Sequence, residues 1–331
     1  MEVQIKKITR IKFTDFSIIP VILVMLVFSQ INALSIDTPF NFLRYQSNAR
    51  TSGLSASTVA LKNDPSALFI NPALISTVEE KTLQVTFLKH VLDINSGGAA
   101  YIHHDKEYGS FAASIGFTSY GSFDYADKLG NRNGQTFGAG NFALGLSYSN
   151  KLDTGLYYGV TVKYIYAGIE DASSSALAFD AGLLYSLPDE RTNLGFSVLH
   201  AGTQLSKISN QSESLPLDVR IGFNHRLRGL PLLFNFSFHH LADESDSFFS
   251  KFKNFNLGGE LYLGNYIQIR LGYDNQVRSM TDAEANKGLT GFSGGVGITT
   301  DDFNFDYGLT SYGSSANLHR FSVSLNINKL L

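Results

Sequence analysis

Polar and apolar residues alternate along most of this chain, and that alternation constrains its fold more than any other feature. Within residues 318–327, Phe321 and Val323 are separated by Ser322, and the pattern continues to both ends of the segment. Residues 217–224, 233–239 and 267–274 repeat it. A period of two residues places the apolar side chains on one face of a β-strand and the polar ones on the other. We therefore predict an all-β protein.

The alternating segments number about fourteen, which is an even number. Each is close to the about 9–11 residues that a tilted strand needs to cross a membrane, and bacterial barrels have even strand numbers. The predicted strands are residues 82–92, 98–105, 110–120, 141–150, 155–167, 176–186, 192–201, 216–227, 232–241, 254–263, 266–275, 292–299, 303–311 and 318–327.

The segments between the predicted strands fall into two kinds. Short turns (106–108, 151–153, 188–190, 228–230, 264–265 and 301–302) alternate with longer, mostly polar connections (121–140, 168–175, 202–215, 242–253 and 276–291). Short turns on one side and long loops on the other are typical of an outer-membrane β-barrel. A soluble β-sandwich is the alternative, but it would not sort its connections in this way. The sequence thus predicts a transmembrane barrel of about 14 antiparallel strands.

Apolar side chains on two neighbouring strands mark the surface expected to face lipid. They are Val219, Ile221 and Phe223 on one strand and Phe234, Phe236 and Phe238 on the next. The polar residues between them would line the lumen, and Asp218, Arg220, Glu260 and Arg270 are candidates for a charged lining. The same four residues would also serve as paired, solvated side chains that fill the interior.

Residues 48–75 do not read as strands and are the candidate plug. The segment is rich in small residues, and Asp64 occupies a helix N-cap position followed by Pro65 at the first helical position. One or two turns can follow, and Asn71-Pro72 should end them because a residue before proline avoids helical geometry. A wide barrel leaves a lumen that wall side chains cannot fill. We predict that this segment is a small helical hatch, held by hydrogen bonds of Asp64 and Asn71.

The first 33 residues resemble a secretory signal peptide. Lys6, Lys7, Arg10 and Lys12 precede the apolar run 18–28, and Ala33 provides a cleavage position. An uncleaved anchor is the alternative, but the run is short for a membrane-spanning helix. The expected organisation is a signal peptide (1–33), an extension with the hatch (34–80) and the barrel (81–331), exported to the outer membrane.

Candidate chemistry in the sequence is sparse. The net charge of −3 gives no basis for nucleic-acid binding, and without cysteine there is no thiolate metal site. Ser293 lies in a G-x-S-x-G pattern, but a nucleophile needs a strand, a sharp turn and a helix, and here the chain continues as a Gly-rich strand. The His103-His104 and His239-His240 pairs would point to opposite strand faces. We predict no catalytic residue, metal or cofactor.

Short motifs spread over the mature chain resemble a known family. They are Asn41 to Arg44, Ala49-Arg50 to Gly53, Asp64, Asn71-Pro72-Ala73, Phe111 to Ala113, Tyr120-Gly121, Phe123 to Asp127, Thr136-Phe137, Gly202 to Leu205, Leu215 to Leu217, Gly258 to Glu260, Arg270 to Tyr273 and His319 to Ser322. In this order they resemble the FadL-like barrels, and more closely the PorV/PorQ family of the type IX secretion system, nearest its PorQ branch. Ser55-Ala56 and Leu74 depart from the commoner hatch pattern, in which many relatives carry glycines at the first pair.

The resemblance implies a non-enzymatic member of a cell-surface attachment complex, with PorZ-like, PorU-like and PorV-like proteins and outer-membrane lipid as partners. It assigns Arg50, Gly53, Asp64, Asn71 and Pro72 to the hatch.

The outer connections 121–140 and 202–215 would then hold a surface partner, with Phe123 and Tyr125 as aromatic contacts of the kind that dominate interfaces. These rings would equally cap the barrel rim. Two other functions stay open. One is a FadL-like transporter of hydrophobic small molecules, although polar outer segments such as 206–214 favour an interaction role. The other is a barrel esterase, which rests on Ser293 alone.

Overall fold

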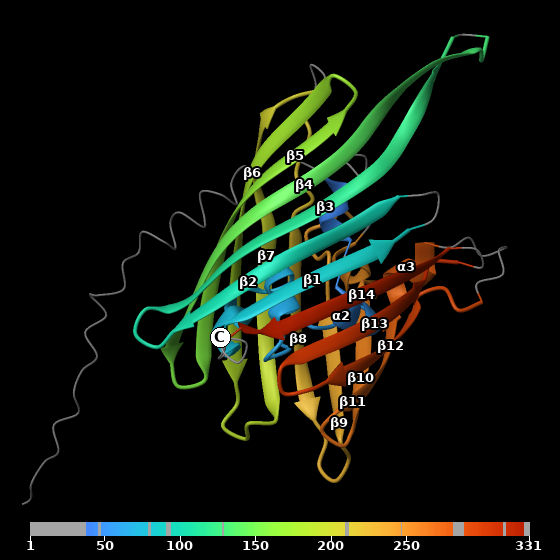
Figure 1. The fold of residues 1–331 in the computed structure, drawn as a ribbon. Helices are drawn as coiled ribbons and strands as arrows, with labels where there is room; N and C mark the ends of the chain where they lie inside the picture. Colours follow the sequence, from blue (N-terminus) through green and yellow to red (C-terminus); the bar gives the residue numbers. More distant parts are fainter. Residues whose placement is uncertain are drawn as a thin grey trace, which may run out of the picture. The chain divides into compact units, whose positions relative to one another are not determined.

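The fold is a closed barrel with a plug inside it (Figure 1). A computed structural model describes residues 38–45, 48–78, 81–90, 94–127, 129–208, 212–245, 247–280, 288–313 and 316–327. Within these residues, fourteen antiparallel strands pair in sequence order, and β1 pairs with β14 to close the ring. The predicted fold class is confirmed. The proposed signal peptide and its cleavage position lie outside the described residues.

The strands keep the predicted positions with changes at their ends. They are β1 (Thr82–Lys89), β2 (Asn95–Asp105), β3 (Gly109–Ala126), β4 (Arg132–Asp153), β5 (Leu156–Ile169), β6 (Ala172–Ser186), β7 (Thr192–Ser206), β8 (Asp218–Arg226), β9 (Leu232–Phe238), β10 (Phe255–Leu263), β11 (Ile267–Asp274), β12 (Phe292–Thr299), β13 (Phe303–Ser311) and β14 (Asn317–Asn326). Two short helices outside the ring, η4 (Phe248–Lys253) and α3 (Asn275–Met280), follow β9 and β11. No helix among the described residues is long and apolar enough to cross a membrane.

The period-2 pattern divides each strand between lumen and exterior. On β9, Asn235 and Ser237 are fully buried inside the barrel, whereas Phe234, Phe236 and Phe238 face outward and are only partly covered. Their rings form part of an aromatic surface with Phe223 of β8. The outward apolar stripe and the inward polar stripe therefore lie where the sequence places them.

Two connections predicted as loops are mostly strand. β3 continues to Ala126 and β4 begins at Arg132, so residues 121–140 form a hairpin, and β5 and β6 reverse across two residues. β3 pairs with β2 only as far as Ser119, and β4 pairs with β5 only from Ala139. The hairpin beyond these points, residues 120–138, is a two-stranded ribbon that reaches past its neighbours (Figure 1). Its polar, Gly-containing sequence does not alternate between polar and apolar residues, because neither face of the ribbon is buried.

The hatch is a chain of short helical turns: η1 (Asn41–Arg44), α2 (Ala49–Gly53), η2 (Pro65–Phe69) and η3 (Pro72–Thr77). Asp64 caps η2 by accepting a hydrogen bond from Ser66 N at 2.9 Å, and Pro65 occupies the first helical position. Asn71 follows the end of η2, as expected, but it also caps η3 by accepting from Ala73 N at 3.0 Å. A proline after a capping residue can therefore begin a second helix directly after the first.

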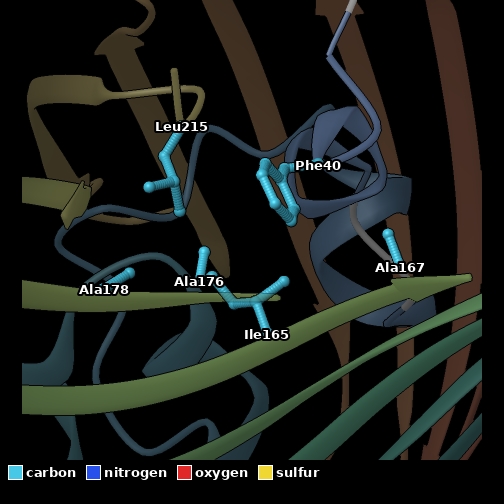
Figure 2. Close-up of a cluster of buried hydrophobic side chains, with 6 residues drawn as sticks. All are labelled: Phe40, Ile165, Ala167, Ala176, Ala178 and Leu215. Atoms are coloured by element: carbon cyan, nitrogen blue, oxygen red, sulfur yellow. The ribbon is translucent and has the colours of Figure 1, made fainter. Parts of the chain in front are cut away.

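Apolar contacts between hatch and wall are divided among several small clusters. One seats Phe40 against Ile165 and Leu215, beside the small residues Ala167, Ala176 and Ala178 (Figure 2). Others place Leu68, Ile75 and Val78 against β2 and β3, and Leu54 and Leu61 against β9. The hatch thus completes the interior that the wall alone cannot fill.

Phe236→Arg should cost about 2–4 kcal/mol of barrel stability, because a charged side chain near mid-membrane is destabilising by that amount on the lipid face. Heat-modifiable gel mobility and urea titration in lipid vesicles would measure it. Leu129→Arg is the matched control, since Leu129 is 87% exposed beyond the barrel and should tolerate the charge. Equal unfolding midpoints for Phe236→Arg and the parent protein would show that this stripe is not in the bilayer.

Candidate functional site

A network of charged residues fastens the hatch to the wall. Arg50 of α2 donates from Nε and Nη2 to the two carboxylate oxygens of Glu260 on β10, at 3.0 and 2.8 Å. Arg270 of β11 donates to the same carboxylate at 2.7 Å and to Asp306 of β13 at 2.6 Å. A bidentate Arg–carboxylate pair fixes orientation as well as distance. The structure therefore joins two wall residues predicted for the lumen, Glu260 and Arg270, to a predicted hatch residue.

Arg50 also ties the hatch to itself. Its Nη1 atom lies 3.6 Å from Asp64 Oδ2, the oxygen of the capping carboxylate that does not hold η2. Burial opposes its charge, but the Glu260 and Asp64 carboxylates raise the pKa of the Arg50 guanidinium well above its usual value. Arg50 is thus charged at every physiological pH. Among the ion pairs of the described residues, it is the one hatch residue that pairs with both Asp64, the cap of η2, and the wall.

Inward-facing glycines bring the wall into direct contact with the hatch backbone. A Cβ atom built at Gly182 would overlap Asn71 Oδ1, and one at Gly159 would overlap the Pro72 carbonyl. Asn71 uses this proximity: its Nδ2 group donates to Val59 O within the hatch at 2.8 Å and to Leu183 O of β6 at 3.0 Å. Asn71 and Pro72, both predicted hatch residues, therefore lie where β5 and β6 have no side chains.

The opposite side of the hatch is seated in the same way. Gly53 at the end of α2 faces Gly295, where an added Cβ would lie 3.2 Å from the Gly295 Cα. Small polar wall residues bond hatch carbonyls and hydroxyls around the ring: Ser293 to Gly53 and Ser55, Asn256 to Ser55, Asn224 to Ala60, Ser197 to Ile70 and Ser149 to Ala73. Ser293 therefore helps to hold the hatch, which accounts for a serine at this position without a catalytic role.

Asp218 and Arg220 lie apart from this network, in a cluster at the outer end of β8. Arg220 Nε donates to Asp218 at 2.6 Å, and the backbone N–H of His240 donates to the other carboxylate oxygen. Burial lowers the pKa of His240 to about 4, against the opposing effect of the Asp218 carboxylate. Glu260 and Arg270 therefore belong to the network that holds the hatch, whereas Asp218 and Arg220 stabilise the outer rim.

A mostly apolar cavity of about 670 Å³ lies at the end of the barrel that carries the long connections. The hatch supplies Phe42 and Tyr45, and the wall supplies apolar and aromatic side chains that include Tyr120, Phe123, Ile169 and Leu318. Polar side chains also line it: Thr38, Asn41, His90, Ser96, Thr118 and Asn141. The Asn141 amide already donates to Pro39 O and Tyr120 Oη. The cavity is thus a mostly apolar chamber above the hatch, which the polar composition of the outer segments did not indicate.

Phe123 and Tyr125 occupy strand β3, and the prediction that they belong to a loop is wrong. Phe123 stacks on Phe137 across the ribbon, with ring centroids 5.4 Å apart, and it also lines the cavity. Tyr125 packs on the same Phe137 ring, and its hydroxyl donates to Glu170. Phe123 therefore covers the mouth of the barrel, while both rings stiffen the base of the projecting ribbon.

A second cavity, of about 650 Å³, lies at the short-turn end, and it is polar. Arg50, Glu260, Arg270 and Asp306 form its inner wall, and Arg226 lies over the Tyr262 ring at 5.0 Å near its opening. The ion-pair network therefore separates the interior of the barrel from water on the short-turn side. Among the described residues, no group of three or more His, Asp or Glu side chains is arranged to hold a metal.

These features define a class of protein: a membrane barrel closed by an N-terminal hatch, with an apolar chamber on one side of it. No family model matches the chain, and no curated protein is similar to it in sequence. Solved structures are similar in fold. The toluene transporter TodX of Pseudomonas putida superposes with a TM-score of 0.54 at 12% identity, over 89% of this chain and 98% of its own.

Two further structures agree. The toluene transporter TbuX of Ralstonia pickettii gives a TM-score of 0.52 at 14% identity, over 84% of this chain and 96% of its own. A TodX variant described as a monoaromatic hydrocarbon channel gives 0.58 at 12% identity, over 84% and 98%. The chain therefore has the fold of the FadL-like barrels, and the names of these neighbours describe transporters and a channel.

Proposed function

We propose that this protein admits small hydrophobic molecules through the outer membrane. The observation that carries the proposal is the apolar cavity of about 670 Å³ at the outer end, with the hatch as its floor. Its volume is within the about 300–1,000 Å³ of small-molecule sites, and its lining of aromatic and aliphatic side chains suits a ligand with little polarity. The hydrocarbon transporters that share the fold support the same class of cargo.

Entry and onward movement have different requirements in this barrel. An apolar molecule gains free energy by leaving water for the cavity, at about 25 cal/mol per Å² of buried apolar surface. Below the cavity it meets a hatch whose backbone is hydrogen-bonded to the wall on several sides. The cavity is therefore a capture site, and release requires the hatch or the wall beside it to move.

A second candidate function is the attachment of a surface protein, as the resemblance to the PorV/PorQ family of the type IX secretion system implies. One observation favours it: the ribbon 120–138 projects beyond its neighbours (Figure 1). Among the described residues, β3 past Ser119 does not pair with β2, and β4 before Ala139 does not pair with β5. Open strand edges accept an added strand from a partner. A PorZ-like protein is the partner that this second candidate would hold.

One experiment with two variants separates the two functions. Ile94→Asp places a charge in the cavity lining and should weaken uptake of radiolabelled toluene by about fivefold or more, because an unpaired polar group in an apolar site costs about 1–3 kcal/mol. Leu129→Asp, at the exposed ribbon tip, is the matched control for the charge. Unchanged uptake in Ile94→Asp would contradict the transport proposal.

The double variant Phe123→Ser/Tyr125→Ser tests the attachment function in the same cells. It removes the two rings that stiffen the base of the ribbon while leaving the strands that close the barrel. Attachment predicts release of a PorZ-like protein into the medium with normal barrel assembly. Retention of such a partner together with reduced uptake would exclude attachment through the ribbon and support transport.

A further inference from the structure

The helix η4, between β9 and β10, exposes more aromatic surface than a water-facing loop explains. Phe248 and Phe249 are 68% and 80% exposed, and Phe252 is 38% exposed. The Phe248 ring contacts the other two edge to face, with centroids 5.7 Å from Phe249 and 5.5 Å from Phe252. A cluster of this kind at one place on the surface marks an interaction site.

The η4 cluster, defined as Phe248, Phe249 and Phe252, is continuous with the outward face of the barrel wall. Phe252 packs edge to face on Phe238 at 5.1 Å, and Phe238 packs on Phe236 at 4.9 Å. Both belong to the stripe that points away from the lumen. The same surface runs on through ring contacts of Phe255, Tyr273 and Phe292 on the next three strands. The cluster therefore extends the lipid-facing surface of the barrel at its outer end.

Hydrogen bonds hold η4 in this position. Ser247 and Ser250 bond each other's backbone N–H in a capping box. Lys251 Nζ donates to Leu241 O at 3.1 Å, and Asn275 Nδ2 donates to Lys253 O at 2.9 Å, so the helix is tied to the end of β9 and to α3. Helix η4 thus holds the rings facing outward, and local hydrogen bonds fix the helix in place.

Basic side chains lie beside the cluster, where they can contact anionic groups. Lys253 is exposed directly after Phe252, and the Arg278 guanidinium lies 5.9 Å from the Phe292 ring centroid at the same rim. Both oxygens of Asp243 accept from Arg44, and Glu244 is exposed. Asp246 also precedes the cluster in sequence, so these acidic residues offset part of the basic charge. Exposed aromatic rings beside basic residues are typical of segments that lie in the membrane interface, where head groups are anionic.

We propose that η4 is a lipid-anchoring element of the outer leaflet. Phe248 and Phe249 insert among the acyl chains beside the barrel, and Lys253 faces the anionic head groups. A site for a protein partner need not adjoin the lipid-facing stripe, whereas a segment that lies in the membrane must. The Phe252–Phe238 contact joins the cluster to that stripe, and this favours the membrane. The anchor would fix how deeply this side of the barrel is placed in the bilayer.

The chain contains no tryptophan, so one introduced residue reports on its own surroundings. Phe249→Trp would be reconstituted in vesicles of phosphatidylethanolamine and phosphatidylglycerol with brominated acyl chains, which quench tryptophan by contact. Phe236→Trp on the lipid-facing stripe and Leu129→Trp on the ribbon tip give the limits for buried and aqueous positions. Heat-modifiable gel mobility shows that each variant is folded.

We expect Phe249→Trp to have blue-shifted emission and to lose most of its fluorescence in brominated vesicles, as Phe236→Trp does. Emission and quenching equal to those of Leu129→Trp would overturn the proposal and leave the cluster as a protein-binding surface. Adding Lys253→Glu should reduce quenching of Phe249→Trp in vesicles with phosphatidylglycerol, and less so in phosphatidylethanolamine alone. Equal quenching in both lipids, with and without Lys253→Glu, would refute the head-group contact.

Discussion

Gly182→Val should convert the closed barrel into one that conducts ions. The Cβ of any residue at this position would overlap Asn71 Oδ1, and Pro72 Cδ would be 2.9 Å away, so both residues must leave the β6 wall. Their departure breaks the Asn71–Leu183 hydrogen bond and removes the N-cap of η3 from its seat. Because the wall strands pair through their backbones, the barrel itself should still form.

Planar-bilayer recordings would measure this opening. Gly116→Val is the matched control, because it also faces the lumen but has no heavy atom within 4 Å of an added Cβ. Deleting residues 48–75 removes the hatch altogether and sets the upper limit of conductance. A deletion that inserts as a barrel yet conducts no more than the parent protein would show that this segment is not the plug.

Local physical chemistry explains what the sequence could predict. Alternation identified the strands because the barrel buries one face of each against the hatch and exposes the other to lipid. The Asp64-Pro65 pair could be read as a helix start because a capping side chain bonds a backbone N–H only two residues away. Asn71-Pro72 is predicted only to end that helix, and the structure shows that the pair also starts η3. Such features depend on neighbours in sequence, and the structure places the strands and the start of η2 as expected.

Features that depend on distant residues were not predictable in this way. Nothing near Glu260 in the sequence shows that it is shared by Arg50 and Arg270, since the first lies 210 positions away. In the sequence, Gly159 and Gly182 are ordinary strand glycines, and only the structure shows that the hatch lies against them. The apolar cavity was not predictable either, because its lining comes from single residues of many strands rather than from one apolar run.

The hatch has a weak and a strong side, and this bears on how it would move. On β5 and β6 it is held by neutral hydrogen bonds and close backbone contact, as at Asn71. On β10, β11 and β13 it is held by the charged network around Arg50. Charge-assisted hydrogen bonds are roughly twice as strong as neutral ones. Under the proposed transport function, movement of the hatch would therefore begin on the side of β5 and β6, with Arg50 as the fixed point.

Glu260→Gln should be among the most destabilising single changes in the interior, because it removes the charge that two arginines share. Breaking a buried ion pair by losing one partner costs about 3–5 kcal/mol, since the remaining charge is left without compensation. Here we expect the lower end of that range, because Arg270 keeps Asp306 and Arg50 keeps Asp64. Urea titration of the reconstituted protein measures the loss, and the exposed Glu244→Gln, which removes the same charge, should change little.

A double-mutant cycle decides whether the loss belongs to the hatch or to the wall. If Glu260 chiefly fastens the hatch, Arg50→Met should cost much less in the Glu260→Gln background than in the parent protein, because the pair it breaks is already gone. The Glu260→Gln variant should then also show raised conductance in planar bilayers. Independent costs for the two changes, with no added conductance, would mean that Glu260 serves the β10–β11 wall through Arg270 and does not hold the plug.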